Sequence, residues 1–355
     1  MEPLYESIAS AAVNGELPRD FSLPDNTAGE NGIKWADGAQ DGVSIYHMGT
    51  PDISKDVMML ISDAVRAADM KDYDLADQLF RMLGRHIRAV SAFEDLQAYI
   101  IENKSTLNGV NLYEYAVHLL FVSEDRESVK FALAMLELFV TDNRKDLKNA
   151  IRTFGLSDEF TLFAIFVMSH WKDGNNEIWK LAKKVHGWGR IHAVEHIKPD
   201  TEEIRRWLLM EGVHNDVLPA YSALTCWDKS CAEDILRRGP SGEEFTGIRD
   251  IISGLLDEGP VTGISEIQNK DEVIYMFLDA AKTMELTLDD CKAIYEIFCF
   301  YREEISDKCE IALICRTILH TYHCTCLILD EARQGRCIDM ATDLGFDCTR
   351  YVTES

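Results

Sequence analysis

The chain has no long hydrophobic run and none of the common nucleotide-binding or hydrolase motifs. An apolar stretch such as Phe163–Met168 is far shorter than the roughly 18 residues that a membrane-spanning helix needs. The acidic start Met1–Glu6 lacks the basic and apolar regions of a secretory signal. A glycine-rich phosphate loop, a dinucleotide fingerprint and a G-x-S-x-G elbow are missing. We therefore expect a cytoplasmic protein with no membrane contact and no cofactor.

Basic residues are scarce. Lys and Arg number 36 against 61 Asp and Glu, which gives a formal net charge of −25. Such a charge repels a nucleic-acid backbone unless a basic face is segregated, and one stretch that leans positive, 172–206, has only a slight excess of Lys and Arg. We therefore expect no nucleic-acid partner, while an acidic surface favours basic proteins.

Cysteine is absent before residue 226. All ten cysteines lie after residue 225, mostly inside apolar helical patterns. A long chain without a secretory signal does not fit a disulfide framework. We expect reduced thiols that are mostly buried and act as small hydrophobic side chains.

Strand signals are absent after residue 51, where helical periodicity takes over. A helix, a polar break and a second helix recur at 112–136, 160–185 and, more loosely, 217–236. Corresponding alanines, such as Ala116 and Ala164, lie roughly 50 residues apart, near the length of two-helix repeats. The pattern predicts an all-α fold.

These helix pairs resemble HEAT and armadillo repeats over roughly residues 55 to 260. The resemblance implies a right-handed α-solenoid, in which each pair buries its apolar face on its neighbours. Most such proteins are scaffolds and binding proteins, with DNA glycosylases as an enzymatic minority. The resemblance concerns architecture and identifies no functional residue.

Three regions are expected: an irregular N-terminal segment over 1–51, a helical-repeat domain over 52–259, and a Cys-rich helical pair or bundle over 260–355. In the first, Ile33–Trp35 and Val43–Tyr46 flank Asp-Gly turns and predict a β-hairpin. The hairpin could cap the open end of the solenoid or form a ligand loop.

The sharpest catalytic motif is His192-Ala-Val-Glu195-His196, which matches the H-x-x-E-H pattern of inverted zinc peptidases. On a helix, His192 and His196 share one face and could bind zinc, with Glu195 as the base. Glu272 could supply a third ligand. The alternative, which we favour, is a structural helix whose buried stripe is Ile191, Val194 and Ile197.

A second metal candidate is His320 with Cys324, four residues apart on one helical face. Its spacing lacks a C-x-x-C pair, so packing inside a helix is the better interpretation. Aromatic side chains could also stack bases, as in helical-repeat glycosylases, but core packing is again preferred. The tryptophans concerned are Trp171, Trp179, Trp188, Trp207 and Trp227.

The sequence thus favours a non-catalytic intracellular interaction protein that binds a protein or peptide partner and no metal. The alternative is a helical-repeat enzyme, either a zinc hydrolase through His192, Glu195 and His196 or a DNA-glycosylase-like protein.

Overall fold

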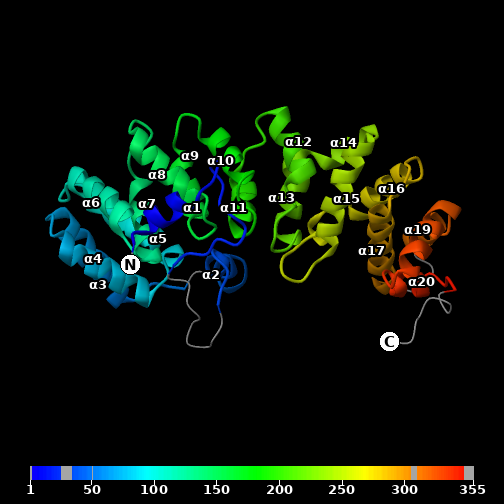
Figure 1. Cartoon of the computed structure of the whole chain (residues 1–355), viewed down its shortest axis with the longest axis horizontal. Helices are drawn as coiled ribbons and strands as arrows, with labels where there is room; N and C mark the ends of the chain where they lie inside the picture. Colours follow the sequence, from blue (N-terminus) through cyan, green and yellow to red (C-terminus); the bar gives the residue numbers. More distant parts are fainter. Residues whose placement is uncertain (1, 25–33, 50, 305–309, 348–355) are drawn as a thin grey trace. The chain divides into compact units, whose positions relative to one another are not determined.

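The computed structural model describes residues 2–24, 34–49, 51–304 and 310–347, and these residues form an all-α protein (Figure 1). Within those ranges the β-structure is limited to one isolated antiparallel bridge between Val13 and Glu16. The all-α prediction is confirmed. The helices pack mainly on helices that are close to them in the chain.

The chain divides into two compact units. The first comprises Met1–Lys198 with Asn215–Val217, and the second comprises Pro199–His214 with Leu218–Ser355. The expected boundary near residue 260 lies inside the second unit. Each unit is described by itself below.

The first unit is built from short helices. Their bounds are α1 Leu4–Ala11, α2 Ala39–Val43, the π-helix η1 Ser44–Met48, α3 Lys55–Asp69, α4 Tyr73–His86, α5 Ala89–Glu102, α6 Gly109–Val122, α7 Arg126–Leu136, α8 Lys145–Gly155, α9 Thr161–Ser169, α10 Gly174–Ala182 and α11 Trp188–His196. The polar breaks predicted inside 112–136 and 160–185 correspond to the gaps between α6 and α7 and between α9 and α10. Asp125 caps the start of α7, because its carboxylate accepts the backbone N–H of Ser128 at 2.9 Å.

Helix α7 lies at the centre of the first unit. It packs on α4, α5, α6 and α9, and every residue from Ser128 to Leu136 is buried. A helix that is buried on all sides should be apolar all round. Lys130, the one charged residue in that stretch, is therefore the feature that needs an explanation.

The expected β-hairpin is wrong. Ala39–Val43 forms α2 and Ser44–Met48 forms η1, whereas Ile33 lies outside the described residues. The reason is packing: a Cβ on Gly42 would come within 2.1 Å of the Trp188 ring, so this glycine serves close contact between α2 and α11. Near the start of the chain, α1 packs on α6 and α8.

The second unit contains α12 Glu202–Glu211, α13 Ala220–Ser230, α14 Ala232–Arg238, α15 Gly242–Leu256, the 3₁₀-helix η2 Ile264–Glu266, α16 Lys270–Ala281, α17 Leu288–Glu304, α18 Glu310–Leu319, α19 Tyr322–Arg333 and α20 Ile338–Asp343. Helix α15 packs on α12, α13 and α17. It starts with a capping box, in which Ser241 and Glu244 bind each other's backbone N–H groups.

Among the described residues, no single helix has both the length and the apolar character to cross a bilayer. Helices α18 and α19 meet that test only when taken together, and they are bent by 74° at their junction.

The described cysteines are all free thiols. Burial is more mixed than expected. Cys226, Cys291, Cys315 and Cys324 are buried, whereas Cys231 is exposed and the others are half-buried. Cys309 and Cys348 lie outside the described residues.

Candidate functional site: a cavity backed by a buried ionic network

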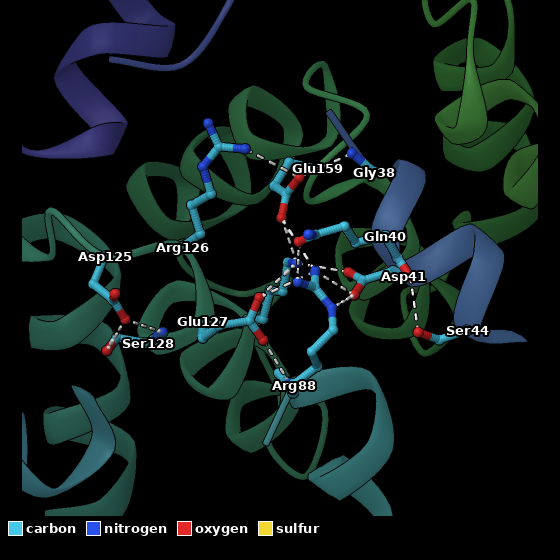
Figure 2. Close-up of polar contacts among 12 residues, drawn as sticks. Gly38, Gln40, Asp41, Ser44, Arg88, Asp125, Arg126, Glu127, Ser128 and Glu159 are labelled. Atoms are coloured by element: carbon cyan, nitrogen blue, oxygen red, sulfur yellow. Dashed lines mark hydrogen bonds and ion pairs between the residues drawn. The ribbon is translucent and has the colours of Figure 1, made fainter. Parts of the chain in front are cut away.

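Lys130 lies at the centre of a buried ionic network in the first unit. Figure 2 shows its partners Asp41, Glu127 and Glu159 pointing toward one another. Its side chain is fully buried. The Nζ atom is 2.6 Å from Oδ2 of Asp41, 2.5 Å from Oε1 of Glu159 and 3.0 Å from Oε1 of Glu127. A buried ammonium group is tolerated only when hydrogen-bonded anions replace its water, and Lys130 has three of them.

Two arginines extend the network. Nη2 of Arg88, just before α5, is 2.6 Å from Oδ1 of Asp41 and 3.3 Å from Oε1 of Glu127. Nη1 of Arg126 is 3.0 Å from Oδ1 of Asp37 and 3.3 Å from Oε2 of Glu159. Each carboxylate thus meets at least one cation. The name ionic network is used below for these seven residues: Asp37, Asp41, Arg88, Arg126, Glu127, Lys130 and Glu159.

Charge in the network depends on the balance between burial and pairing. Burial disfavours the charged form of Lys130, but the surrounding carboxylates outweigh it and raise the lysine pKa above its usual range. Burial also acts against the carboxylates of Asp41 and Glu159, yet Lys130 holds the pKa of both below the ordinary value. At Glu127 burial prevails and the pKa is raised. Lys130, Asp41 and Glu159 are therefore charged at neutral pH.

The network holds residues 37–41 of the N-terminal segment on the helices. The backbone N–H of Gly38 donates to Oε2 of Glu159 at 2.8 Å. Arg88 donates to Oε1 of Gln40 at 2.5 Å and to Oδ1 of Asp41 at 2.7 Å. The helices thus recognise a short stretch of polypeptide through its backbone and its side chains together.

A cavity of 730 Å³ lies beside this stretch. It is lined by Leu17–Arg19, Phe21, Ser22, Lys34–Asp37, Leu156–Asp158, Lys184–Trp188, Asp216 and Val217. One wall is therefore the N-terminal segment, and the others are the α8–α9 turn and the start of α11 with its preceding loop. The volume falls within the range of ligand sites, roughly 300–1,000 Å³. We call it the Asp158 cavity.

Asp158 is held by the start of α11. Its carboxylate accepts the backbone N–H groups of Gly187 and Gly189, and Cβ atoms at those glycines would lie 2.3 and 2.5 Å from its oxygens. Burial raises the pKa of Asp158 to about 7, although the two N–H groups lower it, and Asp37 and Asp216 raise it further. The site therefore contains a carboxyl group that exchanges its proton near neutral pH.

Ser157 is the second unusual group of the cavity. The residue is 2% exposed, and its Oγ atom has no hydrogen-bond partner among the described residues. Buried hydroxyl groups are nearly always paired, so an unpaired one at a cavity wall is a candidate ligand contact.

The H-x-x-E-H residues do not converge on one point. His192 is 1% exposed and its ring stacks on Tyr46. Nδ1 of His196 donates to the carbonyl oxygen of His192 at 2.8 Å, whereas the exposed Glu195 accepts the Tyr46 hydroxyl at 3.0 Å. Glu272 binds Arg237 at 2.8 Å. The favoured stripe of Ile191, Val194 and Ile197 is buried, as expected.

The second metal candidate is also dispersed. His320 is exposed beside Phe346, whereas Cys324 is buried and hydrogen-bonded to Cys291. Within the described ranges, no three His, Cys, Asp or Glu side chains are grouped to hold a metal ion.

The tryptophans belong mainly to the core. Trp171, Trp179, Trp188 and Trp227 are buried, and Trp207 is half-buried. Trp171 also donates to Oγ1 of Thr141 at 2.8 Å. The packing interpretation is therefore confirmed for these four.

A smaller pocket of 580 Å³ in the second unit brings together His214, Asp250 and Cys299. The arrangement resembles a thiol nucleophile with its base, but both ring nitrogens of His214 face carboxylates. Nε2 is 3.1 Å from Asp250 and Nδ1 is 3.5 Å from Glu211. The imidazole consequently has no free nitrogen to accept a proton from Cys299.

Sequence reasoning missed the ionic network and Asp158. One signal was present: Lys130 stands inside the apolar run that follows Ser128, where a charge must find partners. The partners themselves lie 89 and 29 residues away and could not be inferred from the pattern.

No protein-family model, curated protein or solved structure matches this chain. Fold and site together define an all-α protein with a buried ionic network and a cavity in its first unit.

Proposed function

We propose that the protein is a non-catalytic α-solenoid of the HEAT/armadillo type that binds an extended segment of a partner protein in the Asp158 cavity. One observation carries the proposal: the helices of the first unit already hold residues 37–41 of their own chain by backbone and side-chain contacts. A surface of stacked helix pairs is suited to such contact. Right-handed stacking and a cytoplasmic location belong to the same proposal, the latter supported by free thiols.

The test is a selection of random-sequence peptides on the full-length chain, followed by hydrogen exchange of the complex. Bound peptides should protect residues 156–158 and 184–188, which line the cavity. If no peptide is selected, or protection falls only in the second unit, the proposal fails.

The enzymatic alternative has one supporting observation, because a carboxyl with a pKa of about 7 could act as a general acid or base. An activated nucleophile is missing beside it, since the Oγ atom of Ser157 has no hydrogen-bond partner in the described part of the chain. Binding is therefore the better-supported function.

A further inference from the structure

We propose that the Asp158 cavity recognises a basic side chain, lysine or arginine, of the bound segment. The inference rests on the proposed peptide-binding function and specifies its chemistry. Asp158 would be the anion that receives the cationic group, with Ser157 as an additional acceptor.

The carboxylates of the cavity differ in whether a cation pairs with them. Three aspartates line the cavity. Asp37 is 3.0 Å from Arg126 and Asp216 is 3.0 Å from Arg19. Within the described residues, the donors to the Asp158 carboxylate are the backbone N–H groups of Gly187 and Gly189, and the charges that act most strongly on it are the other two aspartates. A cation is the charge that this position lacks.

The hydroxyl group of Ser157 offers a second acceptor. It belongs to the residue next to Asp158, it is buried, and its Oγ atom has no partner among the described residues. An ammonium or guanidinium group has several donors to satisfy at once. A carboxylate and a neighbouring hydroxyl oxygen offer acceptors for two of them.

The charged side chains of the cavity differ in their exposure. The cavity also contains basic residues, but Lys34 and Arg19 are exposed and Lys184 is half-buried. Exposed charges are screened by water and salt, whereas partly buried charges act at lower dielectric. Asp37 and Asp158 are half-buried. Asp158 is thus the half-buried carboxylate of the cavity that belongs to neither of the two ion pairs.

Aromatic walls fit the same ligand. Trp35 and Trp188 both line the cavity, and Trp35 is 40% exposed. A tryptophan face attracts Lys and Arg side chains and packs on their methylene groups. The charge of −25 on the whole chain also favours a basic partner.

The experiment starts from a selected peptide. Its basic residue is replaced by acetyl-lysine or glutamate, and binding to the native chain and to Asp158→Asn is measured by fluorescence anisotropy. We expect acetylation to weaken binding to the native chain at least about tenfold, as expected for a lost partly buried charge pair. In Asp158→Asn, acetylation should change nothing further. Asp146→Asn removes an exposed carboxylate of the same unit and should bind like the native chain.

Two outcomes overturn the inference and leave peptide binding intact. One is a set of selected peptides without a basic residue, and the other is an equal effect of acetylation on both proteins. If no peptide is selected at all, the proposed function fails as well. If Asp158→Asn does not fold, the direction in which Lys184→Met changes peptide affinity tests the inference. Removing this lysine should tighten binding of a basic peptide, and weaker binding would indicate an anionic ligand instead.

Discussion

The Nζ atom of Lys130 lies 2.6 Å from Oδ2 of Asp41, a residue 89 positions earlier in the chain. This contact joins the most buried helix of the first unit to the N-terminal segment. Because Lys130 is fully buried, its removal leaves the carboxylates of Asp41, Glu127 and Glu159 crowded together without their central cation.

Replacing Lys130 by Met should destabilise the first unit by about 3–5 kcal/mol, the usual effect of breaking a buried ion pair on one side. Chemical denaturation of the full chain measures it. Lys71→Met is the matched control, since Lys71 pairs with Glu114 at 2.7 Å while half exposed, and it should lose far less stability because exposed ion pairs contribute little. Equal losses in the two variants would show that the network does not stabilise the fold.

His192 should make the fold sensitive to acid. Burial lowers its pKa to about 4 from the ordinary 6.5, so the unfolded state binds more protons between these values. Its contribution is complete above pH 6.5 and is lost as pH falls toward 4. The native chain should lose about 2 kcal/mol relative to His192→Phe between pH 7 and pH 5. Parallel pH profiles of the two proteins would contradict the lowered pKa.

Asp158 should change the stability of the fold in the opposite direction over a similar pH range. Its pKa is raised to about 7 from the ordinary 3.8, so the folded state binds more protons between these values. Its contribution is present below pH 3.8 and is lost as pH rises through 7. Asp158→Asn should therefore gain stability relative to the native chain as pH rises from 4 to 8. If the stability difference between the two proteins does not change with pH, the pKa of Asp158 is not raised.

Gly42→Ala tests the contact between α2 and α11. The added methyl group would overlap the Trp188 ring, and overpacking of this kind costs typically about 1–3 kcal/mol. Gly109→Ala is the control, because its nearest neighbour would be Phe139 at 3.6 Å. Gly109 is the first residue of α6, so its replacement by Ala should be neutral or slightly stabilising. Thermal unfolding of both variants gives the comparison, and an unaffected Gly42→Ala protein would refute the close packing.

Alkylation of the native protein should distinguish the cysteines. Cys231 is exposed and should react first, whereas Cys226 and Cys315 are buried and should react only on unfolding. In denaturant without reductant, all ten cysteines of the chain should be alkylated. Rapid labelling of Cys226 in the folded protein would contradict the packing of α13.

Local patterns in the sequence predicted the helices well. The break inside 112–136 was visible because polar residues interrupt a helical period there. The stripe of Ile191, Val194 and Ile197 was visible for the same reason. These features depend on neighbours within one or two helical turns.

The site depends on distant neighbours and could not be predicted in this way. Asp-Gly pairs at 37–38 and 41–42 suggested tight turns, yet Gly42 is needed for the approach of Trp188 and Gly38 for that of Asp158. Asp41 looked like a turn residue on the surface, and its role follows only from the position of Lys130. Tertiary contacts here override local turn propensity.

The contacts of the ionic network with residues 37–41 also determine when this segment can dock during synthesis. These residues leave the ribosome well before Arg88, Lys130 and Glu159, the side chains that hold them. The segment must therefore wait until α9 begins to emerge, at roughly 5–20 residues per second. Contacts that span 89 and 121 residues close late because long loops cost entropy. Docking of this segment should consequently be a late step in folding of the first unit.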